Sequence, residues 1–307
     1  MNEASPRVEP PPPASRPLTG ILILLGAVAC FACMDASAKW LNRDLRPLQI
    51  AGVRYVVSLL AVLVFLRPAR TPGVFRAKRP GLQIARGMGL VGATLGVFAS
   101  LRFLPLTQLT AIMFSVPLMT AVLAGPVLGE KLGPRRLVSV LVGFVGVLVI
   151  TRPFAGEVSF ALLFAAGAAL SNAFYVLTTR ALAAHDRPET TLFYTCLVGT
   201  LVVSPALFWE WQMPSTPMVW AVMIGLGCIG ALGHGLLILA HRHAPASVLA
   251  PFFYLQIVGA LFFALTVFDE VPDGWTLLGA AIVIGSGLYL LHRERVRNAP
   301  PSTDVPV

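Results

Sequence analysis

The sequence predicts an all-α integral membrane protein with ten transmembrane helices in two inverted five-helix repeats. Of its 307 residues, 56% are hydrophobic and only 12% are charged, and the mean hydropathy is +0.79. Soluble domains carry about 25% charged residues, so this composition excludes a soluble globular protein. Apolar runs recur along the chain, each close to the roughly 20 residues with which a helix crosses a bilayer. Because they are continuously apolar rather than alternating, they predict helices and not the strands of a barrel.

The apolar runs divide the chain into two repeats and two tails. Residues 1–17 contain four consecutive prolines and little that could be buried, so we expect a disordered cytoplasmic tail there. Residues 293–307 form the cytoplasmic tail at the other end. The first repeat, 18–152, is predicted to hold helices over 18–41, 48–66, 81–103, 106–128 and 135–151. The second repeat, 153–292, is predicted to hold helices over 159–182, 190–209, 218–240, 246–268 and 274–292.

Glycines and prolines predict close packing in one of these helices and kinks in two others. Small residues such as Gly92 and Gly96 let two membrane helices approach closely, which indicates tight packing of the third helix. Pro117 in the fourth helix and Pro245 and Pro251 near the start of the ninth should kink the chain. Such a kink fits either the lining of a cavity or irregular packing.

The distribution of basic residues predicts how the chain is oriented in the membrane. The net charge is +9, and with the N-terminus inside, most Lys and Arg residues of the loops and tails lie on the side of the two termini. The opposite side then carries only Lys39, Arg43, Arg46, Arg102 and Arg152. By the positive-inside rule, we expect both termini of a multi-pass membrane protein to be cytoplasmic. The basic charge is thus explained by topology, and no nucleic-acid partner is expected.

The two halves of the sequence show a weak internal repeat. A shift of 140 residues aligns three pairs of residues, namely Arg102 with Arg242, Pro105 with Pro245, and Glu130 with Glu270. Because each half has an odd number of helices, the second half enters the membrane upside down. Inverted repeats provide two equivalent packings, open to opposite sides, around a substrate near the midplane. Glu130 and Glu270 are expected to cap the helices that follow them.

These features together resemble a known family. The order of ten helices, the residues Pro47, Gln49 and Arg54 at the second helix, and the turns Gly129–Glu130 and Asp269–Glu270 are similar to those of the drug/metabolite transporter superfamily, in its ten-helix form built from two EamA domains. The resemblance implies a secondary carrier of a small organic metabolite in the bacterial cytoplasmic (inner) membrane, driven by a proton gradient or by exchange. The stretch "MDASAKWL" followed by "PLQIAGVRY" is similar to the subgroup with riboflavin and S-adenosylmethionine carriers, which makes cofactor uptake the alternative.

Two charges lie within apolar helices near the outer membrane surface. Asp35 lies about six residues before the end of the first helix and Arg54 about six after the start of the second, so both lie about 9 Å below the surface. Charges at this depth should face the bundle interior. Asp35 and Arg54 form either a structural ion pair or a switch in which Asp35 alternates between Arg54 and a proton or substrate cation. Lys39, one turn from Asp35, either shares its carboxylate or reaches outward.

Three uncharged polar side chains lie deeper in the membrane. Asn172, His234 and Gln256 fall near the midplane by residue count. Each fits either a hydrogen bond between helices or contact with substrate. Because the usual pKa of histidine is near physiological pH, His234 is also a candidate for proton coupling.

Aromatic residues complete the candidate binding site. Phe114 and Tyr254 occupy equivalent positions in the two repeats, and Tyr175 lies in the sixth helix. Flat rings can clamp a planar substrate. Packing within the bundle or contact with lipid is the alternative for each of them.

Other functional classes find no support in the sequence. A membrane enzyme would need clustered catalytic or metal-binding residues, and the sequence has no paired-carboxylate or H-E-x-x-H motif. The loops are too short for a receptor's signalling domain, and there is no Walker motif for ATP. We therefore expect no enzyme activity, no cofactor and no metal. The expected partners are a small-molecule substrate and membrane lipid, and the expected state is a monomer, with a dimer as the alternative.

Overall fold

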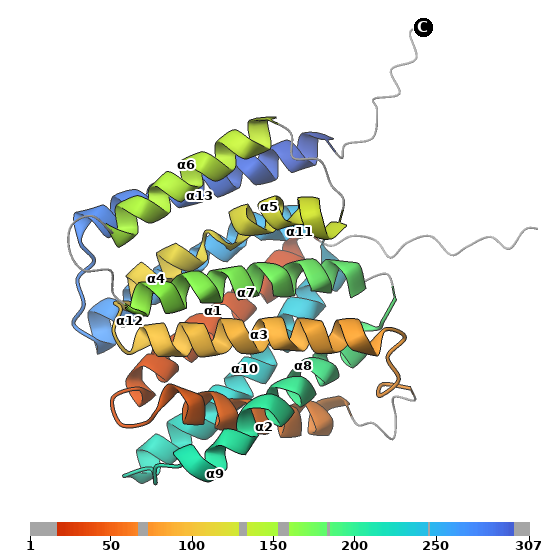
Figure 1. Cartoon of the computed structure of the whole chain (residues 1–307), viewed down its shortest axis with the longest axis vertical. Coiled ribbons are helices and arrows are strands. Elements are labelled where there is room, and N and C mark those ends of the chain that lie inside the picture. Colours follow the sequence, from red (N-terminus) through yellow and green to blue (C-terminus); the bar gives the residue numbers. More distant parts are fainter. Residues whose placement is uncertain are drawn as a thin grey trace, which may run out of the picture.

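The structure is a computed structural model that describes residues 17–66, 73–128, 134–152, 160–182, 185–244 and 246–297. Within these ranges all regular secondary structure is helical, and there is no strand (Figure 1). The all-α prediction is therefore confirmed. Most of the two predicted tails lies outside the described residues, although the last helix continues beyond the expected end at 292 to Arg297.

The first half of the chain forms six helices. These are α1 Pro17–Leu41, α2 Pro47–Leu66, α3 Pro80–Leu101, α4 Leu106–Met113, α5 Val116–Leu128 and α6 Pro134–Thr151. Four of them begin at a proline, whose fixed φ suits the first helical turn, where the missing N–H is not needed.

The second half contains the remaining helices. These are α7 Phe160–Leu182, α8 Pro188–Val203, η1 Ser204–Ala206, α9 Leu207–Glu210, α10 Pro217–His243, α11 Ala246–Leu249, η2 Ala250–Leu255, α12 Gln256–Val267 and α13 Gly274–Arg297. Three of the predicted helices are thus interrupted in the structure, namely 106–128, 190–209 and 246–268.

Prolines account for the interruptions. Pro117 clashes with the carbonyl four residues earlier, that of Met113, and α4 ends at that residue. Pro205 and Pro251 both lie within the short 3₁₀ helices η1 and η2. Pro245, the other proline singled out in the sequence, lies outside the described residues. The predicted kinks are therefore confirmed at Pro117 and Pro251 as breaks in the helical pattern.

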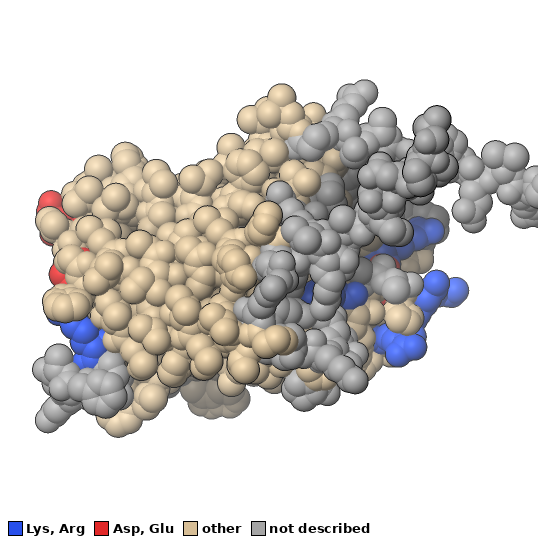
Figure 2. Space-filling view, turned by 90° about the horizontal axis from the view of Figure 1, so that it is seen from above, with Lys and Arg blue, Asp and Glu red and all other residues tan. Residues whose placement is uncertain are grey.

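The helices of the described chain suit a bilayer. Eight helical segments are long and apolar enough to cross a membrane, while Leu137–Thr151 and Pro251–Val267 are shorter apolar helices. Figure 2 views the molecule from the α6 and α13 side, and the charged side chains visible there gather at two opposite ends. The broad surface between these ends shows uncharged residues. The chain is a multi-pass membrane protein.

Helices from the two halves pack against each other in pairs. The main pairs are α1 with α10, α3 with α7, and α6 with α13 (Figure 1). The α3 and α7 backbones approach so closely that a Cβ added at Gly96 would lie 2.8 Å from the Phe164 carbonyl oxygen. One added at Gly92 would lie 2.8 Å from Ser171 Oγ. The tight packing predicted for this helix is confirmed.

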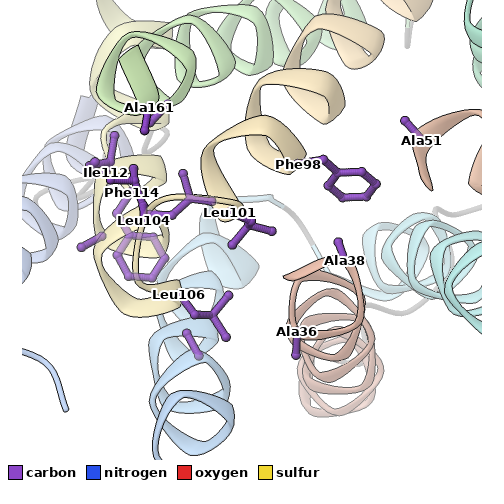
Figure 3. Close-up of a cluster of buried hydrophobic side chains, with 14 of the residues drawn as sticks. Ala36, Ala38, Ala51, Phe98, Leu101, Leu104, Leu106, Ile112, Phe114 and Ala161 are labelled. Carbon is purple, nitrogen blue, oxygen red and sulfur yellow. The ribbon is translucent and has the colours of Figure 1, made fainter. Parts of the chain in front are cut away.

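A layer of apolar side chains fills the region where α3 turns into α4. Phe98, 1% exposed, extends from α3 toward Ala38 of α1 (Figure 3). Leu104, Ile112 and Phe114 gather around α4, and Leu101 lies between them and Phe98 (Figure 3). This layer bounds the polar site described below on one side.

Candidate functional site

Arg54 is the central charged residue of the site. It lies on α2, its side chain is 3% exposed, and its Nη1 donates to Thr94 Oγ1 of α3 at 2.9 Å. Its Nη2 lies 3.5 Å from His234 Nε2 of α10. The guanidinium carbon is 4.9 Å from the centre of the Tyr55 ring and 5.9 Å from that of Phe98. Nε has no hydrogen-bond partner among the described residues.

His234 and Tyr55 tie this arginine into its surroundings. The half-buried His234 ring meets the Phe31 ring of α1 edge-on at 5.2 Å. Because an arginine N–H can only donate, the contact requires His234 Nε2 to accept. Tyr55 Oη shares a hydrogen bond of 3.0 Å with Thr94 Oγ1. The cluster therefore joins side chains from α1, α2, α3 and α10.

The ion pair expected between Asp35 and Arg54 is absent from the part of the chain that the structure describes. Among the described residues, Lys39 pairs with Glu270 and Arg152 pairs with Asp273, but Arg54 has no carboxylate within ion-pair distance. Asp35 is half-buried and accepts a hydrogen bond of 3.1 Å from Gln256 Nε2 of α12. The reason is geometric: Arg54 turns toward α3 and α10, whereas Asp35 turns toward α12.

Lys39 also departs from the expectation that it shares the Asp35 carboxylate. Its Nζ lies 2.7 Å from Glu270 Oε1 and donates to the Leu104 carbonyl oxygen at 2.8 Å. Glu270 Oε2 in turn accepts from the Leu106 backbone N–H at 3.1 Å. One ion pair thus links α1, the start of α4 and the turn after α12.

Glu270 caps a helix as predicted, but not the helix that the sequence indicated. Glu270 caps α4 in the other half of the chain, not the helix that follows it. Asp273 caps that following helix, α13, by accepting from Thr276 N at 2.8 Å, and hydrogen bonds from Thr276 lower the pKa of Asp273. Glu130, the other predicted cap, lies outside the described residues.

Arg86 of α3 forms a second polar cluster, with α7 and α8. Its Nε donates to Thr179 Oγ1 at 2.7 Å and its Nη2 to Tyr175 Oη at 2.8 Å. Its Nη1 donates to the Thr191 carbonyl oxygen at 3.2 Å and to Thr195 Oγ1. Every nitrogen of this guanidinium therefore has a partner. Tyr175, one of the predicted site residues, is thus a hydrogen-bond partner of Arg86 in this conformation.

The remaining aromatic and amide residues of the predicted site are Phe114, Tyr254 and Asn172. Phe114 and Tyr254 meet edge-on with ring centroids 5.0 Å apart, so the structure brings this equivalent pair together. Tyr254 Oη is buried without a partner in the described chain, and it lies so close to Gly287 that a Cβ there would be 1.8 Å away. Asn172 is half-buried on α7.

Most residues of these two clusters were not singled out as site residues from the sequence, and Arg86 and Thr94 are the central ones among them. Arg86 could have been predicted from the sequence, because a charge inside an apolar membrane helix should have buried partners. Thr94 carries no such signal, since threonine is common in membrane helices and only the rotation of α3 shows that it faces Arg54.

The chain belongs to the EamA-like transporter family. The family model matches it twice, over residues 18–152 and 159–291. The prediction of a transporter of this family is thereby confirmed. Among the described residues no group of three or more His, Cys, Asp or Glu side chains could hold a metal ion.

Characterised relatives span almost the whole chain. It is 30% identical to a riboflavin transporter of Vibrio cholerae, over 91% of this chain and 94% of that protein. It is also 30% identical to an S-adenosylmethionine uptake transporter of Rickettsia conorii, with the same coverage. A pseudopaline exporter of Pseudomonas aeruginosa is 26% identical over 90% of this chain and 97% of its own length. One solved crystal structure, 18% identical, shares the fold with a TM-score of 0.63 over 92% of this chain and 99% of that one.

Proposed function

We propose that the chain is a secondary active transporter that moves a small organic metabolite across the bacterial cytoplasmic membrane by alternating access, without enzyme activity of its own. The observation that carries this proposal is the polar cluster of Arg54, Thr94 and His234, contributed by three helices of a membrane protein. Charged groups inside a membrane are expensive and mark substrate or ion pathways. The family match supports the same conclusion.

We further propose ten membrane helices in two inverted repeats, 18–152 and 153–292, with both termini cytoplasmic and one chain as the working unit. Under the sequence shift, the packing of α1 on α10 corresponds to that of α7 on α3. The packing of α1 on α12 likewise corresponds to that of α7 on α5. Such reciprocal pairs are what two repeats related by a two-fold axis in the membrane plane would form.

Asp35 is the proposed coupling residue. In this conformation its carboxylate accepts from the neutral Gln256 amide rather than from a cation. A half-buried carboxylate in that setting suits a proton or a substrate cation. We propose that Asp35 and Arg54 pair in the opposite conformation, so that occupancy of Asp35 is linked to the state of the bundle. The surroundings of His234 would then change as well, because its ring contacts Arg54 directly.

Cofactor uptake is the second candidate function. It is favoured by relatives named for riboflavin and S-adenosylmethionine. The edge-on Phe114 and Tyr254 pair, one ring from each repeat, would suit a planar ring system. Asn172, on a third helix, would supply an amide to its polar edge.

The test is uptake of a labelled panel into proteoliposomes. Riboflavin, S-adenosylmethionine, amino acids and purines are offered with and without an imposed proton gradient, to wild type and to Asp35→Asn. Asp44→Asn, an exposed carboxylate in the α1–α2 turn, is the matched control. We expect gradient-dependent accumulation of one substrate class, lost in Asp35→Asn and kept in Asp44→Asn. Uptake that survives Asp35→Asn would return Asp35 to a structural role, and no uptake of any compound would contradict the transport assignment for this panel.

A further inference from the structure

The guanidinium of Arg54 has one buried edge whose hydrogen-bonding capacity the described chain does not satisfy. Nε and Nη2 together form the side of a guanidinium that binds a carboxylate through two parallel hydrogen bonds. In Arg54, Nε has no partner in the described chain, and Nη2 has only His234 at 3.5 Å, the outer limit for a hydrogen bond. A buried donor without a partner is destabilising. An acceptor supplied by a ligand would therefore remove a free-energy cost that the protein alone leaves in place.

Arg54 also has no counter-ion in this conformation. No described carboxylate lies within ion-pair distance of it, and Asp35 is bonded to Gln256. Arg86 shows that such a charge can be fully hydrogen-bonded by the protein itself. In this conformation Arg54 therefore has neither a described carboxylate within ion-pair distance nor a full set of hydrogen-bond acceptors.

The backbone of α10 lies directly against this edge, with no space for a side chain larger than that of glycine. Gly230 of α10 faces it, and a Cβ added there would lie 3.3 Å from Arg54 Nε, 3.5 Å from Met34 Sδ and 3.6 Å from Ser58 Oγ. The α10 helix thus presents bare backbone to Nε. Met34 and His234, which flank the group, are both only half-buried.

We propose that Arg54 binds a carboxylate of the transported metabolite through Nε and Nη2, which makes the substrate a carboxylate-bearing organic compound. This inference rests on the proposed transport function and deepens it. A planar carboxylate fits the planar two-donor edge. A single negative charge also matches the single positive charge of Arg54, whereas a phosphate monoester would bring close to two negative charges to it.

Binding of a minimal carboxylate tests this directly. The purified full chain is heated with tens of millimolar sodium acetate, acetamide or sodium chloride at constant ionic strength and pH, and its unfolding temperature is recorded. We expect acetate alone to raise this temperature, because a ligand that binds the folded state stabilises it. The rise should persist in Arg102→Gln, which removes an exposed arginine, and disappear in Arg54→Gln. Equal temperatures in acetate and acetamide for wild type would overturn the proposal.

Two further variants guard against misfolding of Arg54→Gln. Arg54→Lys keeps the charge but loses the two-donor edge and should bind acetate at least about tenfold more weakly. Gly230→Ala leaves Arg54 intact but places a methyl group against Nε, and it should also weaken acetate binding. Acetate binding that is unchanged in both variants would place the anion elsewhere.

The uptake panel separates failure of this inference from failure of the transport assignment. Uptake of amino acids or S-adenosylmethionine, which carry carboxylates, with competition by other carboxylates but not by their amides, would support both. Uptake of riboflavin or purines alone would confirm transport and overturn the carboxylate assignment. Inorganic phosphate, included as a competitor, should be ineffective, and competition by phosphate would redirect the site to phosphate esters.

Discussion

Two buried arginines in neighbouring membrane helices differ in how completely the protein hydrogen-bonds them. Arg86 donates from all three nitrogens to side chains and backbone of α7 and α8. Arg54 makes one good hydrogen bond and one long contact, and its Nε has no partner among the described residues. The difference teaches that burial of a charge does not by itself indicate function. A fully bonded charge fastens helices together, and an incompletely bonded one is available to a ligand or a moving partner.

The largest expected effect is on folding, at Arg86. Arg86→Met should lower the free energy of unfolding by about 3 kcal/mol, because it removes several buried hydrogen bonds between helices. Thermal unfolding in lipid nanodiscs would measure this, with the exposed Arg102→Met as the control. An unchanged unfolding temperature would show that the Arg86 cluster does not fasten α3 to α7 and α8.

Arg54 should show the reverse pattern. Arg54→Met should change the free energy of unfolding by less than about 1 kcal/mol, since few hydrogen bonds are lost. Its transport rate per folded molecule should fall by about 100-fold, which corresponds to a barrier higher by about 2.7 kcal/mol. Uptake in proteoliposomes, normalised to folded protein, would measure it. If Arg54→Met instead unfolds and its remaining folded molecules transport normally, then Arg54 has the same structural role as Arg86.

Matched threonine substitutions sharpen the comparison. Thr94→Val removes the acceptor of Arg54 Nη1 and the partner of Tyr55, so it should destabilise the protein by about 2 kcal/mol. Thr195→Val should cost less, about 1 kcal/mol, because Arg86 Nη1 keeps the Thr191 carbonyl oxygen. Chemical unfolding of both variants in one lipid would rank them. The opposite ranking would mean that Arg54 is better satisfied than its contacts indicate.

The smallest effect concerns pH, at the end of the Arg86 cluster. Asp186 accepts from Lys78 N at 2.7 Å and Gln83 Nε2 at 2.9 Å. Partial burial acts to raise the pKa of Asp186, but hydrogen bonds from Lys78 and Gln83 outweigh it, and the pKa is lowered below its usual value. A lowered pKa stabilises the fold above the unfolded-state pKa, and this contribution is lost as pH falls through the folded-state pKa.

Asp186→Asn should therefore lower the free energy of unfolding by about 1 kcal/mol at neutral pH. The gap between wild type and variant should close as the pH falls below about 4, where the wild-type carboxyl is protonated. Unfolding measured across this pH range checks the sign. A gap that widens in acid would contradict it.

Hydropathy alone located the helices, because crossing a bilayer demands continuous apolar runs. The breaks near Pro117 and Pro251 followed from proline chemistry. Asp35 and Arg54 stood out as charges in apolar surroundings, yet their partners did not follow from the sequence. Which residues face one another depends on how each helix is rotated about its axis, and that rotation is set by packing between the halves.

Glu270 illustrates the same limit at a helix end. A carboxylate in a turn before a helix predicts a cap, but Glu270 caps a helix in the other half of the chain, and its neighbour Asp273 serves the local one. Local rules could not choose between the two carboxylates. The choice depends on Lys39, which lies more than two hundred residues away along the chain and draws Glu270 toward α4.

The contact between Lys39 and Glu270 also sets the resting population of the proposed cycle. It crosses from one half of the chain to the other, and opening that end would break a partly exposed ion pair and two hydrogen bonds to backbone. Together these contribute roughly 2–3 kcal/mol. If the two states are otherwise equal in free energy, that bias leaves only about one molecule in a hundred open at this end without a ligand. A substrate arriving from that side would find few receptive molecules, so this one contact can tune apparent affinity from outside the binding site.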